Sequence, residues 1–233
     1  MMESEIAVGS GVQLTCSKDD LVGALGVVSR AVSTRGAVQV LSGVLLQASA
    51  GSLELAATDM ELSLRTRIDA SVDGKGAVVL PGKLIADLAR LLPADEVSIV
   101  YRPEDGTAEI RSGSYTSRLN VFAAEDFPRL PSVDVPLQGI AAPSLLATIE
   151  RVSRSASRDE SRPVLTGILV RFETDKLVMA ATDSYRLSVK ETLLEHPGPE
   201  LEAIIPARAL GELARIAGGA ESLQLGVNEN HVV

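Results

Sequence analysis

The chain has 233 residues, of which 45% are hydrophobic and 23% charged, and its formal net charge is −9. This composition excludes a disordered chain, because enough apolar surface exists to offset the entropy of ordering. No apolar run approaches the ~18 residues that cross a bilayer. The single cysteine, Cys16, cannot form an internal disulfide, which favours a reducing, cytoplasmic location. With only His196 and His231 beside it, we expect no zinc site and no cofactor.

The first part of the chain alternates strand-like and helical patterns. A short alternating run at 12–16 predicts a strand, and Ser17 follows as the N-cap of a helix that we extend to Ser33. Apolar residues at helical spacing support this helix. A second helix begins at Pro81. We predict further strands at 40–48, 52–57, 61–68, 77–80, 97–101, 107–111 and 115–119, giving the order β-α-β-β-β-β-α-β-β-β.

The sequence contains an internal repeat. VSR at 28–30, VLSG at 40–43 and AATD at 56–59 recur as VSR, VLTG and AATD, each 124 residues later. The offset becomes 125 from the match of Leu62-Ser63 with Leu187-Ser188, which predicts a one-residue insertion directly after the second Thr-Asp pair. LPGK at 80–83 matches IPAR at 205–208 at this new offset. The chain is therefore read as two copies of one domain.

The repeat sets the domain boundaries. We predict a first domain at 1–124, a linker rich in proline and acidic residues at 125–136, and a second domain at 137–233. The second domain is expected to be incomplete, because the first continues through strands that the second lacks. Its predicted elements are strands at 137–140, 164–172, 177–181, 185–191, 201–205 and 222–226, with helices at 143–158 and 206–217. Two helices among many antiparallel strands indicate an α+β fold.

Basic residues concentrate on the predicted helices. Arg151, Arg154 and Arg158 are spaced to share one helical face. Lys83 and Arg90 flank an acid in the first copy, as Arg208 and Arg215 do in the second. The four predicted helices carry nine basic and five acidic residues, a net charge of +4 on an acidic body. This suits sequence-independent attraction to phosphates, although a solvated face with i,i+4 ion pairs is the competing interpretation.

The sequence offers weak candidates for catalysis. The duplicated pairs Thr58-Asp59 and Thr182-Asp183 each separate two strands, where aspartate is favoured because it can bond its own backbone in a turn. No nucleophile elbow, phosphate loop or Ser/His/Asp order accompanies them, so we predict a non-catalytic protein. Arg35, beside a glycine, is either a loop tip that touches phosphate or a plain exposed turn.

Longer motifs resemble one family. SRDESRPVLTG at 157–167, followed by AATDSYRL at 180–187, resembles the middle domain of the bacterial sliding clamp, the beta subunit of DNA polymerase III. VLSGVLL at 40–46, LPGK at 80–83 and DFPRLP at 126–131 resemble its first domain. The resemblance implies a duplicated clamp domain with sheets outside and two helices per domain lining an inner face. It also implies that a third domain is absent here, so we expect a C-terminally truncated chain.

The resemblance further implies a processivity factor that encircles double-stranded DNA and tethers the polymerase without doing chemistry. Its partners would be the DNA polymerase III alpha subunit, the clamp loader, other proteins with a clamp-binding motif, and itself in a head-to-tail ring dimer. DNA-binding positions are then expected at Arg35, Lys83, Arg90, Arg151, Arg154, Arg158, Arg208 and Arg215. One wall of a partner-peptide cleft is expected at Leu165, Thr182, Tyr185, Arg186 and Leu187.

Other hypotheses remain open at this stage. A two-domain interaction module built from clamp repeats would not encircle DNA, and charge reversal of the basic positions would leave DNA loading unaffected. An enzyme acting through the Thr-Asp pairs would lose turnover when Asp59 or Asp183 is replaced by asparagine. A two-copy clamp that closes as a trimer is a further architecture, but the motifs resemble the bacterial type.

Overall fold

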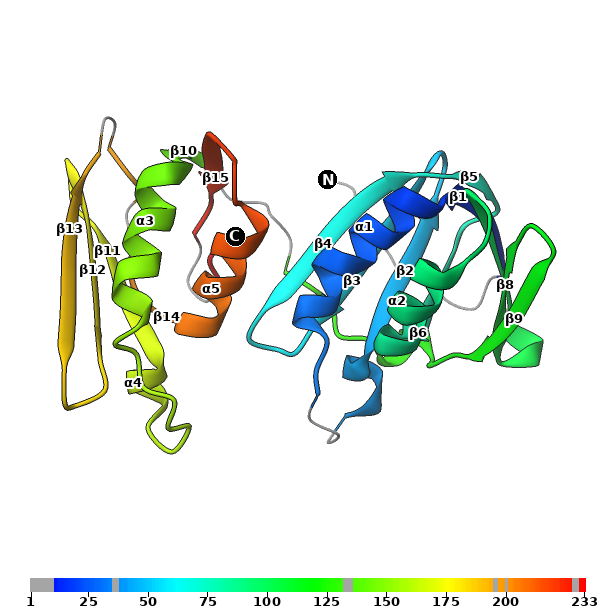
Figure 1. Cartoon of the computed structure of the whole chain (residues 1–233), viewed down its shortest axis with the longest axis horizontal. Helices are drawn as coiled ribbons and strands as arrows, with labels where there is room; N and C mark the ends of the chain where they lie inside the picture. Colours follow the sequence, from blue (N-terminus) through cyan, green and yellow to red (C-terminus); the bar gives the residue numbers. More distant parts are fainter. Residues whose placement is uncertain (1–10, 35–37, 132–135, 195–196, 200, 228–230) are drawn as a thin grey trace. The chain divides into compact units, whose positions relative to one another are not determined.

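The computed structural model describes residues 11–34, 38–131, 136–194, 197–199, 201–227 and 231–233. The chain forms two compact units, Met1–Leu130 and Pro131–Val233, and their boundary falls inside the stretch 125–136. Each unit combines antiparallel sheets with two longer helices, which confirms the α+β class (Figure 1). Arg35 lies outside the described residues.

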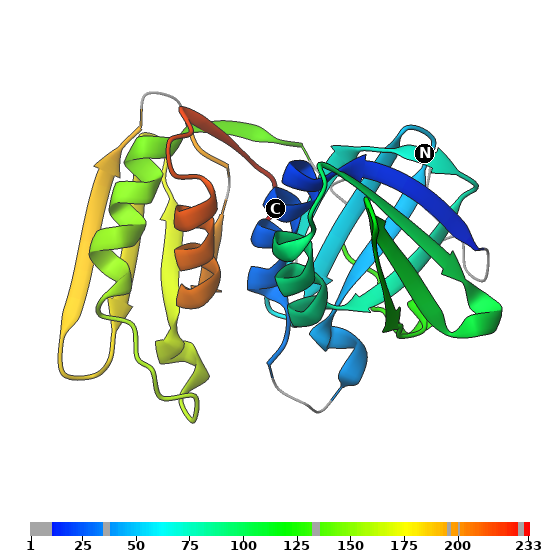
Figure 2. The same ribbon diagram turned by 45° about the vertical axis from the view of Figure 1, so that its right-hand side comes forward.

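The described part of the first unit has two antiparallel sheets. One sheet has the strand order β5-β1-β7-β8-β9 and the other β4-β3-β2-β6. Helices α1 and α2 lie side by side and pack against strands of these sheets (Figures 1 and 2). The elements are β1 (Val12–Ser17), α1 (Lys18–Val28), β2 (Gly43–Ser49), β3 (Ser52–Thr58), β4 (Ser63–Asp69), β5 (Ser71–Asp73), β6 (Gly76–Pro81), α2 (Gly82–Leu91), β7 (Glu96–Arg102), β8 (Thr107–Ser112) and β9 (Tyr115–Asn120).

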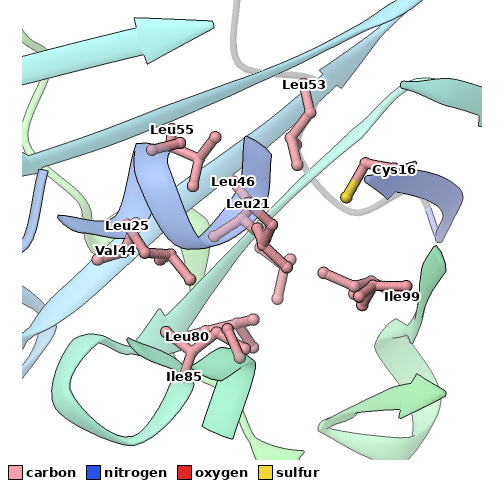
Figure 3. Packing of buried hydrophobic residues seen from close by; sticks show 14 of the residues in the cluster. Cys16, Leu21, Leu25, Val44, Leu46, Leu53, Leu55, Leu80, Ile85 and Ile99 are labelled. Carbon is pink, nitrogen blue, oxygen red and sulfur yellow. The ribbon is translucent and has the colours of Figure 1, made fainter. Parts of the chain in front are cut away.

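A single apolar core joins the helices of the first unit to its sheets. Ser17 caps α1 as predicted, because its hydroxyl accepts a bond from the Asp20 N–H at 3.4 Å. The apolar spacing of α1 then turns Leu21 and Leu25 inward. Burial, and secondarily Asp20, raises the pKa of Cys16 to about 11, so its thiol stays protonated. Figure 3 shows the packed side chains, among them Leu21, Leu25, Val44, Leu46, Leu53, Leu55, Leu80, Ile85 and Ile99.

The second unit repeats this plan in its described residues. A four-stranded sheet has the order β13-β12-β11-β14, and β10 pairs with β15. The elements are β10 (Gln138–Ala141), α3 (Ala142–Ser153), α4 (Pro163–Thr166), β11 (Gly167–Phe172), β12 (Lys176–Thr182), β13 (Leu187–Leu193), β14 (Glu202–Pro206), α5 (Ala207–Ile216) and β15 (Ser222–Leu225).

The backbone register corrects the position of the insertion between the repeats. Thr58 pairs with Ser63 in the first unit, and Thr182 pairs with Leu187 in the second, so the offset is still 124 at this point. The turns between these strands also match, with positive φ at Met60 (76°) and Ser184 (78°). The extra residue therefore lies between β13 and β14, and the predicted match of Leu62-Ser63 with Leu187-Ser188 is wrong.

Two predicted strands begin later than expected. Residues 39–42 form a 3₁₀ helix, η2, and 163–166 form α4, before β2 and β11 begin at a glycine. The reason is a hydroxyl at the same repeat position, since Ser42 Oγ donates to Gln39 O at 2.6 Å and Thr166 Oγ1 donates to Pro163 O at 2.8 Å. These bonds close a turn that competes with the extended backbone. The short strand β5 was not predicted.

Candidate nucleic-acid and peptide interfaces

Helices α2 and α5 present the same basic surface in the two units. Lys83 and Arg90 are exposed on α2, while Ile85 and Ala89 are buried on its opposite side. On α5, Arg208 and Arg215 are exposed at the matching positions. Both helices have a proline as N-cap residue and an apolar stripe that fixes which face turns outward.

An ion pair recurs on both of these helices. Arg90 Nη1 lies 3.4 Å from Asp87 Oδ1, and Arg215 Nη1 lies 2.6 Å from Glu212 Oε1, each at i,i+3. The Arg90–Asp87 pair is exposed on both sides, and such pairs contribute little to stability. Their effect is electrostatic, because each leaves its helix a net charge of about +1 rather than +2.

Helix α3 ends sooner than the sequence indicated. It stops at Ser153, so Arg154 is its C-cap residue and Arg158 lies beyond it. The prediction that Arg151, Arg154 and Arg158 share one helical face is therefore wrong. The physical cause is tertiary: Ser155 Oγ bonds Ser188 Oγ at 2.6 Å, and the Ser157 N–H donates to Leu165 O at 2.8 Å. These bonds compete with continuation of the helix, which therefore ends at Ser153.

The charge on the helices is correspondingly smaller. Helices α1, α2, α3 and α5 contain six basic and five acidic residues, a net charge of +1 instead of the predicted +4. The difference comes from Arg30, Arg154 and Arg158, which lie past the ends of α1 and α3. Arg154 also pairs with Glu150, at 3.4 Å. Positive charge is thus localised at particular positions rather than spread along every helix.

The turn between β12 and β13 is held by its own aspartate. Asp183 Oδ1 accepts bonds from the backbone N–H groups of Tyr185 and Arg186, both at 3.0 Å. Arg186 Nε donates to Asp183 Oδ2 at 3.0 Å, and Thr182 Oγ1 donates to Arg186 O at 2.7 Å. The Tyr185 N–H is the main cause that holds the pKa of Asp183 below its ordinary value.

The first unit has the same turn, which settles the role of the Thr-Asp pairs. Asp59 Oδ1 accepts bonds from the N–H groups of Glu61 (3.1 Å) and Leu62 (2.9 Å). The structural role predicted for both aspartates is confirmed. Where the first turn carries Glu61 and Leu62, the second carries Tyr185, 95% exposed, and Arg186.

A charged loop lies against the second turn. Arg162 Nη1 donates to Ser184 Oγ at 3.2 Å, and Arg162 Nε donates to Asp159 Oδ2 at 2.8 Å. Bonds from the Ser161 hydroxyl, and then from Arg162, lower the pKa of Asp159. Since the Leu165 N–H donates to Arg162 O at 3.0 Å, the loop also links α4 to the turn. The predicted cleft residues Leu165, Thr182, Tyr185, Arg186 and Leu187 therefore belong to two neighbouring segments.

The described residues contain neither a candidate metal cluster nor a candidate membrane-spanning helix. No group of three or more His, Cys, Asp or Glu residues there is placed to hold a metal ion. No helix in that part of the chain is long and apolar enough to cross a membrane.

Both units match known protein-family models. Residues 12–131 match the model of the DNA polymerase III beta subunit, N-terminal domain, and residues 140–233 match that of its central domain. The chain belongs to the DNA polymerase III beta subunit family.

Curated relatives of this family member are beta sliding clamps. The clamp of Streptomyces coelicolor is 30% identical over 220 residues, which cover 93% of this chain and 58% of the relative. That of Synechococcus elongatus is 35% identical over 223 residues, covering 92% of this chain and 59% of the relative. The sliding clamp of Bacillus subtilis superposes with a TM-score of 0.90 at 27% identity, covering 96% of this chain and 61% of that one. The chain therefore spans about three fifths of the length of these proteins.

One surface of this family member was missed by the sequence reasoning. The outward side chains of β13 include Leu187, Val189 and Leu193, which are 67%, 57% and 79% exposed. Of these three residues the sequence analysis assigned only Leu187 to a surface, as part of the expected peptide cleft. The signal was present in the alternation of LSVKETL, in which every apolar side chain lies on the same face.

Proposed function

We propose that the protein serves as the two-domain body of a sliding clamp, a processivity factor that surrounds double-stranded DNA without reading its sequence. The observation that carries the proposal is the paired family match together with the basic positions repeated on α2 and α5. Exposed cations at fixed helical positions suit contacts with phosphates, which position a protein without specifying bases. A topologically closed ring needs little affinity, because escape requires opening of the ring.

The proposal includes a non-catalytic role in the cytoplasm, where bacterial chromosomes are replicated. It also includes head-to-tail closure into a ring dimer in proteins of the relatives' length. The DNA-binding positions in this proposal are Arg35, Lys83, Arg90, Arg151, Arg154, Arg158, Arg208 and Arg215.

Retention on circular and linear DNA tests the proposal. We expect a protein of the relatives' length that contains these two units, loaded onto nicked circular DNA with a clamp loader, to stay bound until the DNA is cut. Lys83→Glu should weaken retention and lower the slope of log affinity against log salt by about one. Arg67→Glu makes the same charge change on β4, where Arg67 is paired with Glu54 at 3.2 Å, and should leave retention unchanged. Equal loss from circular and linear DNA would favour an interaction module that does not encircle DNA.

We further propose that Leu165, Thr182, Tyr185, Arg186 and Leu187 form one wall of a cleft for short linear motifs. The partners would be the DNA polymerase III alpha subunit, the clamp loader and other proteins with a clamp-binding motif. Supporting this, Leu187 is 67% exposed beside a turn that Asp183 holds in place, so an apolar anchor can be buried on a rigid surface.

Binding of a clamp-binding-motif peptide tests this wall. Leu187→Ala should weaken binding about tenfold, the loss typical of an anchor contact. Leu193→Ala, at the other end of the same strand and also exposed, is the matched control and should bind as the parent does. Equal affinities for the two variants would show that Leu187 is not part of the cleft.

A further inference from the structure

The turn after β3 and the turn after β12 have the same internal bonds. The N–H of Met60 donates to Thr58 Oγ1 at 3.1 Å in the first unit, and the N–H of Ser184 donates to Thr182 Oγ1 at 3.1 Å in the second. Met60 and Ser184 both have a positive φ, which residues other than glycine rarely adopt. The shape of each turn is therefore set by bonds within the turn.

The second turn has an additional bond to another segment. Arg162, in the loop before α4, donates from Nη1 to Ser184 Oγ at 3.2 Å. The repeat places Val38 and Met60 at the matching positions of the first unit. Because a valine side chain has no hydrogen-bond donor, the first unit cannot form this bond. The bond therefore fixes the second turn relative to its neighbouring loop in a way that the repeat does not share.

Arg162 is itself held in place by its own loop. Its Nε donates to Asp159 Oδ2 at 2.8 Å. Asp159 Oδ1 accepts bonds from the Ser161 N–H at 3.0 Å and from the Ser161 hydroxyl at 2.6 Å. The guanidinium is planar and carries several donors in fixed directions, so it can bind the carboxylate and the Ser184 hydroxyl together. Arg162 therefore joins a loop with internal bonds to a turn with internal bonds.

The two joined segments carry residues of the proposed peptide wall. The Leu165 N–H donates to Arg162 O at 3.0 Å, which couples the position of Leu165 to that of the arginine. On the other segment, Tyr185 and Leu187 follow Ser184 and are 95% and 67% exposed. A peptide that contacts both segments binds more tightly when they are already fixed relative to each other, because less ordering is required on binding.

We propose that Arg162 is a positioning residue of the peptide wall. By binding Asp159 and Ser184 at the same time, it fixes the loop before α4 relative to the turn between β12 and β13. Its effect on the peptide passes through Ser184 and not through a contact of its own. The inference rests on the proposed function of this wall and adds the residue that holds its two segments together.

A double-mutant cycle tests the inference. The probe is a synthetic peptide with the clamp-binding motif of the DNA polymerase III alpha subunit, and NMR titration of the 233-residue chain measures its affinity. Arg162→Ala and Ser184→Ala should each weaken binding about three- to tenfold, because the two segments must then be ordered on binding. The double variant should bind no more weakly than Arg162→Ala, because both substitutions remove the same bond.

The spectra of the free chain give a signature that does not depend on the peptide. The cross-peak of the Arg162 Nε–H should shift in Ser184→Ala, because the guanidinium loses its second acceptor. The amides of 183–187 should shift in Arg162→Ala. The amides of 59–62 should stay unchanged, because the first turn has no bond of this kind to lose.

Further variants separate the bond from charge and from folding. Arg162→Lys keeps the charge without the planar fork, and should also weaken binding. Arg171→Ala is the matched control, because it removes an arginine that is exposed to a similar degree, 42% against 43%, and pairs with Glu173 at 3.0 Å. It should bind the peptide as the parent does. Circular dichroism establishes that the variants fold, and if Arg162→Ala does not, Ser184→Ala measures the same bond.

Three results would overturn the inference. They are parental affinity in Arg162→Ala, single losses that add in the double variant, and unshifted amides at 183–187 in Arg162→Ala. Additive losses would mean that Arg162 contacts the peptide itself. A parent chain that binds no peptide up to about 1 mM would overturn the proposed wall, and this inference with it. A parent that binds while Arg162→Ala is unaffected removes only the positioning role, so the two failures are distinguishable.

Discussion

The edge strands β4 and β13 occupy equivalent places in the two units, but they place polar and apolar side chains on opposite faces. On β4, Leu64 and Ile68 lie on the face toward the helices and pack against the apolar core with α1. The residues of β13 that match Leu64 and Ile68 are Ser188 and Thr192, which lie on the face toward α3. Toward the outside, β4 presents polar residues and β13 presents leucine and valine. A repeated backbone therefore does not require a repeated apolar pattern, provided that hydrogen bonds satisfy the inward polar groups.

The inward polar groups of β13 are satisfied in this way. Thr148 Oγ1 donates to Ser144 O at 2.7 Å and lies 2.7 Å from Thr192 Oγ1. Lys190 Nζ donates to both Thr148 Oγ1 and Thr192 Oγ1 at 3.1 Å. Position 148 corresponds to Ala24 on α1. The second unit thus joins helix and strand by a hydrogen-bond network where the first uses apolar packing.

The largest expected effect is the difference in lost stability between truncating a buried leucine and truncating an exposed one. Leu46, on β2, is 1% exposed within the core, so Leu46→Ala should lower the free energy of unfolding by about 2–5 kcal/mol. Leu193, on β13, is 79% exposed, and Leu193→Ala should change it by less than about 0.5 kcal/mol. Urea unfolding measures both, and similar losses would mean that the outer side of β13 is covered.

Two glycines at equivalent positions should differ in how well they tolerate replacement by alanine. A Cβ on Gly43 would meet Val79 and lie 3.1 Å from Val40 O, whereas one on Gly167 would meet Ile204 and lie 3.6 Å from Val164 O. Val79 is fully buried and cannot move aside, but the half-exposed Ile204 can. We expect Gly43→Ala to cost about 1–3 kcal/mol by overpacking, and Gly167→Ala less than about 1 kcal/mol. Thermal unfolding of the two variants should reveal this order, and the reverse order would contradict it.

Much of this asymmetry could not be read from the sequence. The repeat, the cap at Ser17 and the Thr-Asp turns were predictable, because each depends on residues close together in the chain. The end of α3 was not, because Ser155 and Ser157 find their partners on β13 and α4. The sequence named candidate site residues, whose roles stay predictions, but it could not supply their geometry. Whether an arginine lies on a helical face depends on where tertiary bonds end the helix.

The polar network gives a smaller and more specific effect. Thr148→Val keeps the shape but removes a hydroxyl that bonds both Thr192 and Lys190. We expect a loss of about 1–3 kcal/mol in the free energy of unfolding, since buried polar groups then lack partners. Adding Thr192→Val should recover part of this loss. A double-mutant cycle measures the coupling, and strictly additive losses would show that the two hydroxyls do not stabilise each other.

The smallest effect concerns the pKa of Asp183 in the turn between β12 and β13. Asp183 has a pKa below its ordinary 3.8, so its stabilisation is fully present above that value and is lost as pH falls through the lowered pKa. Arg186→Leu introduces a leucine like Leu62 of the first turn and removes the guanidinium. We expect the pKa of Asp183 to rise part of the way, because the Tyr185 N–H still bonds it. NMR titration of the carboxyl groups measures the change, and an unchanged midpoint would assign the lowering to backbone bonds alone.

The paired turns have a consequence for engineering. Asp59 to Leu62 and Asp183 to Arg186 are loops of equal length, with the same aspartate bonds and nearly the same φ at their second residue, 76° and 78°. Each loop is therefore an exchangeable segment, held by its own aspartate and by the threonine that precedes it in both units. Grafting the sequence DSYR into the first unit would transplant an exposed tyrosine and arginine without redesigning the scaffold. The exposed side chains of this turn could then be varied independently of the fold that carries them.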